Sequence, residues 1–482
     1  MDAPAAAEGG SAPTAAEGGR ASPQPVGAPL AALVGDETVV PCAGGSERRY
    51  VNLDAAASTG ALPAVAARVA EFVPWYASVH RGAGYKSQLA TAAYEDARSA
   101  ALAFAGRDPS GDDVAVICRN TTEAVNHLAY RLRLSATDTV VTTVAEHHAN
   151  LLPWARFCRR RFVEAGPDGT FTLDDVLEAL DAGPTPVLLA VTAASNVSGW
   201  CPPVEEIIVA AHRRGVRVLV DGAQLAAHAP LPPGADFVAW SGHKMYAPFG
   251  AGILIGPRDA FADGDPFLAG GGAVDLVDLD EVEWTAPPDR EEAGSPNVIG
   301  AVALHAAIEE LGRIGWDRIM AHDAALADRL RRGLAAIPGV RVLGPGPETP
   351  TLPLATFTVD GLPHSLVAAR LSAEHAVAVR HGCFCAHPYL IRLLGLTPDD
   401  VARYRSEVRG GDRSAMPGAV RASAGINTGG EDIDRLLAGV ASIAAGDPAP
   451  VGYVQDASTG DFMPAGAAAP DAGRRRAACN PG

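Results

Sequence analysis

Short apolar runs rich in β-branched residues alternate with longer amphipathic segments through the middle of this chain. The runs that predict buried strands are 114–117, 139–142, 187–191 and 216–220. Between them, a helical periodicity covers 122–133 and 204–214. Strands that alternate with helices predict an α/β fold, in which a mostly parallel sheet is covered by helices on both faces. In such sheets, ligands bind beyond the carboxyl ends of the strands.

The length of 482 residues is enough for two domains. We expect a large domain over residues 31–300 and a smaller C-terminal α+β domain over 301–446. The smaller domain is predicted from helical patterns at 301–336 and 365–373 and from strand patterns at 340–343 and 354–359. We expect both ends, 1–30 and 447–482, to be disordered, because chains rich in Ala, Gly and Pro bury too little apolar surface to offset their entropy.

Composition excludes several classes of partner. The net charge is 39 − 56 = −17, and the basic residues are spread along the chain, which argues against binding to nucleic acid. No apolar run reaches the roughly 18 residues of a membrane span, and the start of the chain does not look like a signal peptide. The seven cysteines have irregular spacing, which favours reduced thiols. We therefore expect a cytoplasmic protein.

Polar side chains follow each of the four predicted strands. Thr121 and Thr122 open a helix, where hydroxyls and free backbone N–H groups suit a phosphate. His147 follows the second strand, Asn196 the third and Asp221 the fourth. Each residue also has an ordinary interpretation, as a helix cap, a loop residue or a turn residue. Their order along the chain favours a shared site at one edge of the sheet.

Lys244 is one of only two lysines among 39 basic residues, and it lies just past the apolar run 237–240. Unlike arginine, lysine can lose its proton and attack a carbonyl as a neutral amine. Its retention therefore predicts an aldehyde cofactor. We interpret the other lysine, Lys86, as a residue of the surface or the rim of the site.

Six motifs in this order resemble those of class V aminotransferase-fold enzymes, and they are most similar to the cysteine desulfurases and selenocysteine lyases. The motifs are Thr121-Thr122-Glu123, Glu146-His147-His148-Ala149-Asn150, Asn196-Val197, Asp221-Gly222-Ala223-Gln224, Ser241-Gly242-His243-Lys244 and Glu292-Ala293-Gly294-Ser295-Pro296-Asn297. The resemblance runs from about residue 52 to 439. It implies pyridoxal phosphate as cofactor, the fold-type I transferase architecture, and a homodimer with sites at the subunit interface.

The resemblance also implies a role for each motif residue. Lys244 would bind the cofactor covalently, Asp221 would pair with its pyridine nitrogen, and His147 would stack on its ring and move protons. The other cofactor contacts would come from Gln224 and Asn196 at the phenolic edge, from Thr121, Thr122, Ser241 and His243 at the phosphate, and from Ser295 of the partner subunit.

The substrate end of the site is implied by the C-terminal third. Arg380 and Arg421 would bind the carboxylate of a small amino-acid substrate, because the guanidinium fork matches a carboxylate bidentately. Cys385 stands where the cysteine desulfurases have their sulfur-accepting cysteine. The resemblance therefore implies conversion of L-cysteine to L-alanine, with the sulfur left on Cys385 as a persulfide and then passed to an acceptor such as a sulfur-acceptor protein.

Two departures from the family leave alternatives open. The family's motif has histidines before the cysteine, whereas this chain has Cys383-Phe384-Cys385, a sequence that is also similar to the C-terminal loop of molybdenum-cofactor sulfurases. The extra thiol could resolve a persulfide, form a disulfide with Cys385, or be inert. Zinc bound by His381, Cys383, Cys385 and His387 is a rival interpretation, but the spacing is not that of a zinc site and we expect no metal.

The second departure is the length of the link between Cys385 and Arg421. Its 35 residues are more than usual, and the added segment could act as a lid, alter substrate choice or recruit a sulfur acceptor.

Other functions remain open at this stage. A different pyridoxal phosphate reaction, such as that of a carbon–sulfur lyase, an epimerase or an aminotransferase of secondary metabolism, would use Asp221 and Lys244 but would not need Cys385. A non-enzymatic sulfur-relay protein could keep the fold without the chemistry. Cysteine and selenocysteine would use the same pocket groups, so the sequence does not separate them.

Overall fold

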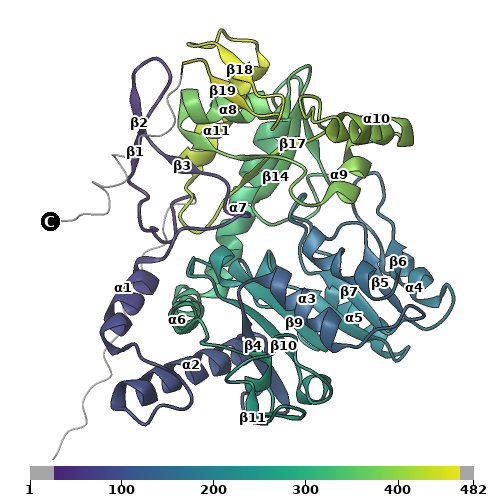
Figure 1. Ribbon diagram of the computed structural model, residues 1–482. Helices are drawn as coiled ribbons and strands as arrows, with labels where there is room; N and C mark the ends of the chain where they lie inside the picture. Colours follow the sequence, from purple (N-terminus) through teal and green to yellow (C-terminus); the bar gives the residue numbers. More distant parts are fainter. Residues whose placement is uncertain (1–26, 467–482) are drawn as a thin grey trace, which may run out of the picture.

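The computed structural model describes residues 27–466, and part of each end that we expect to be disordered lies outside that range. A seven-stranded sheet fills the lower half of the molecule, in the order β4–β10–β9–β8–β7–β5–β6 (Figure 1). Its strands are β4 (Asp113–Cys118), β5 (Thr139–Thr143), β6 (Arg159–Val163), β7 (Leu188–Thr192), β8 (Arg217–Asp221), β9 (Phe237–Ser241) and β10 (Gly252–Pro257). Only β10 runs antiparallel to its neighbours, which confirms the predicted α/β class with a mostly parallel sheet.

Helices cover both faces of this sheet. Those of the large domain are α1 (Pro63–Phe72), α2 (Tyr85–Phe104), α3 (Thr121–Arg131), α4 (Leu173–Asp181), α5 (Val204–His212) and α6 (Val298–Ile314). Alternate residues of a strand face opposite sides, so Leu188 of β7 packs in the cluster that contains α3, whereas Leu189 packs in the one that contains α5. Burial on both sides explains the continuous apolar runs. Among the described helices, none combines the length and apolar character that crossing a membrane requires.

The smaller domain is built on a four-stranded antiparallel sheet with the order β13–β14–β17–β16. Its elements are α7 (Trp316–Ala335), β13 (Val340–Leu343), β14 (Leu354–Val359), α8 (His364–His375), β15 (Val377–Ala378), β16 (Arg380–Gly382), β17 (Ala419–Ser423) and α11 (Gly430–Ala444). Apolar residues of α7, α8 and α11 form its core against the sheet. This arrangement confirms the predicted α+β domain.

The boundaries of the domains differ from the prediction in two places. The helix expected over 301–336 is broken at Gly315, where a φ of 95° ends α6 and turns the chain into α7. Helix α6 packs on α1 and α2 of the large domain, whereas α7 packs on β13 and β14. The N-terminal strands β1 (Val39–Pro41), β2 (Glu47–Arg49) and β3 (Val51–Asn52) lie in the upper half of Figure 1, and β3 pairs with β15 of the small domain.

The expectation of disorder from residue 447 was wrong for residues 447–466. Here β18 (Tyr453–Gln455) and β19 (Phe462–Pro464) form an antiparallel hairpin that packs on α8. The Tyr453 hydroxyl donates to Glu374 Oε1 at 2.9 Å, and the Gln455 amide donates to the carbonyl of Ser414 at 2.9 Å. The hairpin is therefore held by contacts with the small domain rather than by a core of its own, which is why composition did not reveal it. The end beyond residue 466 lies outside the described residues.

The link between Cys385 and β17 contains two helices. These are α9 (His387–Leu394), which packs its apolar side into the core, and α10 (Pro398–Arg409), which has no buried residue. A loop then leads back to β17 past the hairpin described above. The unusually long link is thus an ordered addition at the side of the small domain.

Candidate active site

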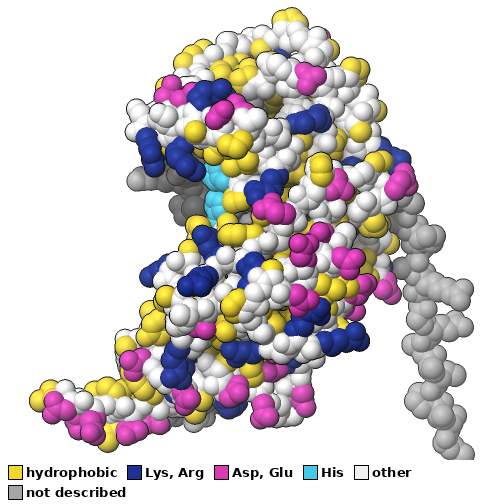
Figure 2. All heavy atoms as spheres, turned by 90° about the vertical axis from the view of Figure 1, so that its right-hand side faces the viewer, with side chains coloured by type: hydrophobic (Ala, Val, Ile, Leu, Met, Phe, Trp, Pro, Cys, Tyr) yellow, Lys and Arg dark blue, Asp and Glu magenta, His cyan; other side chains and the backbone are white. Residues whose placement is uncertain are grey.

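A pocket of about 870 Å³ lies where the strands of the large sheet end, facing the small domain. Figure 2 shows histidine side chains gathered in a recess between the upper and lower halves of the molecule. Every site residue that the sequence predicts lines this pocket, with the exception of Ser295. These residues are Thr121, Thr122, His147, Asn196, Asp221, Gln224, Ser241, His243, Lys244, Arg380, Cys385 and Arg421.

The centre of the pocket contains Asp221 and Lys244. Asp221 ends β8 and is almost fully buried, and its Oδ1 accepts a hydrogen bond of 2.9 Å from the backbone N–H of Ala223. Burial raises the pKa of Asp221, an effect that this hydrogen bond and the nearby Lys244 oppose. Lys244 closes the short helical turn that follows β9, and burial lowers its pKa to about 8 although Asp221 acts in the other direction. The neutral amine is therefore more abundant near neutral pH than it is for an exposed lysine.

One end of the pocket suits an anion. The N-terminus of α3 opens there, and the backbone N–H of Thr121 donates to Ser241 Oγ at 2.8 Å, while the two hydroxyls lie 2.7 Å apart. Neither Thr121 nor Thr122 caps the helix, because Asn120 accepts the capping hydrogen bond from Glu123. The hydroxyls therefore remain at a helix N-terminus, the arrangement that favours a phosphate.

A glycine allows this close packing at the phosphate end. A Cβ on Gly252 of β10 would lie 2.5 Å from the Cα of Asn120, so a larger residue would push the start of α3 away from the sheet. Beside it, His243 Nδ1 lies 3.3 Å from the Ser58 hydroxyl, and burial lowers the pKa of His243. These residues together form a site that suits a phosphate group.

His147 faces Lys244 from the loop after β5. Its Nδ1 accepts a hydrogen bond of 3.0 Å from the backbone N–H of Ala149, which leaves the proton of the neutral ring on Nε2. Burial lowers the pKa of His147 to about 4, helped by the positive charge of Lys244. The ring is therefore neutral and presents one N–H to its surroundings.

Glu146 lies beneath this loop, and no role was predicted for it. The side chain is fully buried and accepts hydrogen bonds from the Thr143 hydroxyl at 2.7 Å, the Asn150 amide at 2.8 Å and the Thr192 backbone N–H at 3.0 Å. Burial raises the pKa of Glu146 to about 8. Its position in the second motif was the only signal in the sequence, and the contacts show that it ties the ends of β5 and β7 together.

Arg380 and Arg421 lie side by side on β16 and β17, as their pairing in the sheet shows. Both contact Asp54, with Arg380 Nη2 at 2.9 Å and Arg421 Nη2 at 3.2 Å from the two carboxylate oxygens. Arg421 is buried and also donates to the carbonyl of Asn196 at 2.8 Å, and burial lowers its pKa to about 10. Asp54 was not predicted, since it lies outside every predicted strand and only the folded chain brings it to the arginines.

The segment that carries Cys385 is a tight turn. The Ala386 N–H donates to the Cys383 carbonyl at 3.0 Å, and both central residues, Phe384 and Cys385, have a φ of 54°. Positive φ at both central positions is typical of type I′ turns, which usually need Gly or Asn. Residues with a Cβ adopt this conformation at a cost of about 1–2 kcal/mol each, so the surrounding contacts must hold the turn in place.

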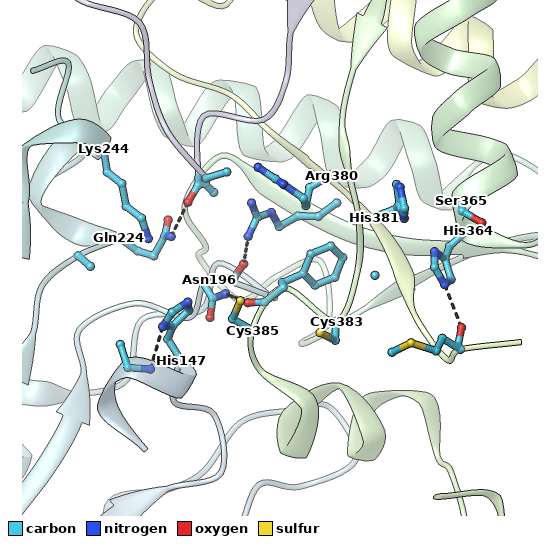
Figure 3. A pocket seen from close by; sticks show the side chains of 18 of the residues that line it. His147, Asn196, Gln224, Lys244, His364, Ser365, Arg380, His381, Cys383 and Cys385 are labelled. Atoms are coloured by element: carbon cyan, nitrogen blue, oxygen red, sulfur yellow. Dashed lines mark hydrogen bonds between the residues drawn. The ribbon is translucent and has the colours of Figure 1, made fainter. Parts of the chain in front are cut away.

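Three residues provide those contacts: Asn196, which was predicted to contact the cofactor, Arg421, which was predicted to bind the substrate, and His148, for which no role was predicted. The Asn196 amide donates to the Phe384 carbonyl at 2.7 Å, and the backbone N–H of His148 donates to the Cys385 carbonyl at 2.7 Å. The ring of Phe384 is buried beneath the Arg421 guanidinium, 5.1 Å from its centre. Contacts with both domains therefore hold the turn at residues 383–386, here called the cysteine turn, in place (Figure 3).

Gln224 also has a contact that the sequence did not predict. Its side-chain amide donates to the carbonyl of Ala56 at 2.8 Å, which leaves the amide oxygen for a ligand in the pocket. Ser295 lies elsewhere, in a separate exposed pocket lined by residues 76–81 and by Asp275. The predicted contact of Ser295 with the cofactor of a second subunit stays a prediction.

The zinc interpretation is not supported by the geometry. His387 stacks on His148 with ring centres 5.2 Å apart, whereas His381 stacks on His364 at 5.4 Å. The two histidines therefore belong to different pairs, and the part of the chain that the structure describes does not gather them with Cys383 and Cys385 around one point. Both cysteines are free thiols, so the disulfide is absent from this structure.

Comparison with known proteins gives one consistent result. A sequence model of the family described as aminotransferase class-V matches residues 51–436. A probable cysteine desulfurase of Mycolicibacterium paratuberculosis is 37% identical over 70% of this chain and 50% of its own length. A cysteine desulfurase of Klebsiella pneumoniae is 34% identical over 81% of this chain and 92% of its own length. The chain thus spans about half of the first relative and nearly all of the second.

Solved structures agree with the sequence matches. The apo structure of a cysteine desulfurase from Thermococcus onnurineus superposes with a TM-score of 0.73 and 31% identity, covering 82% of this chain and 95% of that one. A cysteine desulfurase from Escherichia coli gives a TM-score of 0.70 and 32% identity over the same shares of the two chains.

Proposed function

The chain belongs to the class V aminotransferase family, and from this premise we propose that it is a pyridoxal phosphate-dependent cysteine desulfurase. It would convert L-cysteine to L-alanine and accept the sulfur on Cys385. The observation that carries the proposal is that one pocket combines Lys244, Asp221 and the buried Arg421 with the thiol of Cys385. The names of the relatives above support the same reaction. The other class V reactions considered above would use this pocket without needing its thiol.

The residues present fit pyridoxal phosphate. Its phosphate would lie at the N-terminus of α3, against the hydroxyls of Thr121 and Ser241, and its aldehyde carbon would meet the amine of Lys244. When bound, the cofactor supplies an electron sink for the substrate's electrons, and a carboxylate at the position of Asp221 keeps its ring nitrogen protonated. The buried position of Asp221, beside a lysine and away from water, suits that pairing.

The protein's own groups then perform separate tasks. Arg421 presents a buried guanidinium for the substrate carboxylate, and Arg380 adds a second positive charge beside it. Lys244 accepts and returns a proton at Nζ, because its lowered pKa allows both forms near neutral pH. Cys385 takes the substrate's sulfur as the nucleophile, and the fastened turn holds it in position.

Product analysis tests this proposal. Purified protein loaded with cofactor should release equal amounts of alanine and sulfide from L-cysteine in the presence of a reductant. The Cys385→Ser variant should lose turnover by about 100-fold or more, whereas Cys201→Ser, at an exposed cysteine outside the pocket, should match the wild type. Pyruvate or a keto acid in place of alanine, or full turnover by Cys385→Ser, would show a different reaction. A parallel assay with selenocysteine determines which of the two substrates is preferred.

The proposal includes the assembly and the location. We infer a homodimer with shared sites, because the exposed aromatic residues Trp75, Tyr76 and Tyr85 cluster near the separate pocket that contains Ser295. The free cysteines of the described chain suit a reducing compartment such as the cytoplasm.

A further inference from the structure

The pocket extends well beyond the groups that the proposed reaction uses. Its outer part, here called the outer chamber, is formed by residues 363–365, 413–417 and 459–461 together with His381 and Cys383. The second of these segments belongs to the long link before β17, and the third is the turn of the β18–β19 hairpin. The chamber is therefore formed largely by the long link, which departs from the family pattern, and by the hairpin, which was not predicted.

Hydrogen bonds connect the segments that form the outer chamber. The backbone N–H of Arg413 donates to the carbonyl of Ala457 at 2.8 Å, and its guanidinium donates to the carbonyl of Ser458 at 3.0 Å. His364 Nε2 lies 3.1 Å from the carbonyl of Met416, which fixes the loop against α8. Burial lowers the pKa values of His364 and His381, although the Asp461 carboxylate, whose Oδ1 lies 3.5 Å from His381 Nε2, acts in the other direction. These contacts hold the segments that line the outer chamber in place.

Two thiols connect the inner pocket with this compartment. In Figure 3 the sulfur of Cys385 lies beside Asn196 and His147, whereas the sulfur of Cys383 lies on the side of His381 and His364. The turn between them is closed by a hydrogen bond and anchored by the buried ring of Phe384. Because two consecutive residues hold a strained positive φ, the chain retains a costly geometry that keeps both thiols on the pocket.

We propose that Cys383 is a second sulfur carrier, which takes the outer sulfur atom from Cys385 and presents it in the outer chamber to a low-molecular-weight thiol. The proposal rests on the proposed desulfurase function, since that reaction loads Cys385. The Cys383 thiolate attacks the outer sulfur of the Cys385 persulfide, a new S–S bond forms at Cys383, and Cys385 leaves as a thiolate. One S–S bond replaces another and the proton passes between the two thiols, so no oxidant or reductant is needed.

A second exchange of the same kind completes the transfer. The thiolate of the small acceptor attacks the outer sulfur on Cys383 and leaves with it as a new persulfide, which restores the Cys383 thiolate. Cys385 is meanwhile free for the next substrate. A small acceptor suits a compartment whose walls, residues 363–365, 413–417 and 459–461, lie apart from the residues that would hold the cofactor.

Trapping of persulfides tests the relay. Holoenzyme is mixed with one equivalent of L-cysteine without an acceptor thiol, then alkylated, and the sulfur is located by fragmentation of the 381–392 peptide, which cleavage after arginine releases. We expect extra sulfur on both cysteines in the wild type, on Cys385 alone in Cys383→Ala, and on neither in Cys385→Ala. With added 2-mercaptoethanol as acceptor, Cys383→Ala should keep its first-turnover burst of alanine but turn over about 10-fold more slowly.

The outcomes separate the relay from the proposed function. Sulfur confined to Cys385 in the wild type, or steady-state turnover of Cys383→Ala at the wild-type rate, would overturn the relay alone. Absence of alanine from the wild type would overturn the proposed function instead. Cys383→Ser, which is close in size to cysteine, guards against misfolding of the alanine variant, and Cys201→Ser is the matched control for loss of a thiol outside the pocket.

Discussion

Lys244 and Lys86 have the same side chain in very different surroundings. Lys86 is exposed and donates to the carbonyl of Pro74 at 2.7 Å, whereas Lys244 lies in the pocket with a pKa lowered to about 8 by burial. Only a neutral amine attacks an aldehyde, and the neutral fraction of Lys244 grows as the pH rises towards 8. The surroundings of Lys244 therefore make the attachment of an aldehyde cofactor pH-dependent.

This difference gives the first prediction. When protein stripped of cofactor is mixed with pyridoxal phosphate, the rate at which its yellow absorbance develops should rise with pH up to about 8 and then level off. Lys244→Arg should develop no such absorbance, because arginine stays protonated, while Lys86→Arg should behave as the wild type. A rate that continues to rise to pH 10 would show that burial does not lower the pKa of Lys244.

Glu146 supplies a second prediction, on stability. Its pKa of about 8 lies above the ordinary value of 4.5, so between these pH values the folded protein holds a proton that the unfolded chain has lost. Stability from this group is therefore present at low pH and falls as the pH rises from about 4.5 to about 8. Glutamine does not titrate, so the Tm of Glu146→Gln minus the Tm of the wild type should increase as the pH rises from 5 to 9. Curves of Tm against pH that run parallel for Glu146→Gln and the wild type would contradict this prediction. The control is Glu164→Gln, which changes an exposed ion pair with Arg392.

Individual site residues differed in how well the sequence revealed them. Asp221 and Lys244 could be predicted because the carboxyl ends of parallel strands meet at one edge of the sheet. Asp54 could not, since its ion pairs join residues 326 and 367 positions away in the sequence. Asn196 was found as a pocket residue, but its hydrogen bond to Phe384 depends on a turn whose positive φ values no local pattern indicates.

Elements with a strong local pattern were predicted closely. The strands expected at 340–343 and 354–359 match β13 and β14, and the four strands expected in the large sheet match β4, β5, β7 and β8 within one residue at each end, whereas β6 and β10 were not predicted. The direction of β10 and the break at Gly315 depend on tertiary packing, and neither was predicted. The β18–β19 hairpin was missed because its stability comes from α8 and from the loop at 413–417, not from its own composition.

The hairpin supports a third prediction, on access to the outer chamber. None of its residues belongs to the apolar core clusters, so a chain that ends at residue 450 should still fold. Removal of Thr459, Gly460 and Asp461 should open the chamber and accelerate alkylation of Cys383 by a bulky maleimide about 10-fold, read from the 381–392 peptide. A chain that ends at residue 466 keeps the hairpin and is the control. Equal rates in the two truncated proteins would show that the hairpin does not shield Cys383.

On the scale of the whole molecule, the pocket is formed jointly by the two domains. The large sheet provides Asp221 and Lys244, the small domain provides the arginines and the cysteine turn, and residues before β4 provide Asp54. Ser295, however, lies in a separate exposed pocket, near exposed apolar residues such as Tyr76. A single chain therefore places every predicted site residue but Ser295 in this pocket, and in the proposed homodimer a second copy would supply the last one.

Mixed dimers test this arrangement. Ser295→Asp should repel the cofactor's phosphate, and Lys244→Ala removes the reactive amine, so each variant alone should be inactive. If Ser295 serves the site of the other subunit, a mixed dimer has one site with both native residues. In that site, Lys244 comes from the Ser295→Asp chain and Ser295 comes from the Lys244→Ala chain. After the variants are unfolded and refolded together in equal amounts, about a quarter of all sites should be native, and activity should return to about that level. Mixing with a Lys244→Ala, Ser295→Asp double variant is the control, since no native site can form. If Ser295 acts only within its own chain, or the protein is a monomer, the mixture of single variants stays as inactive as that control.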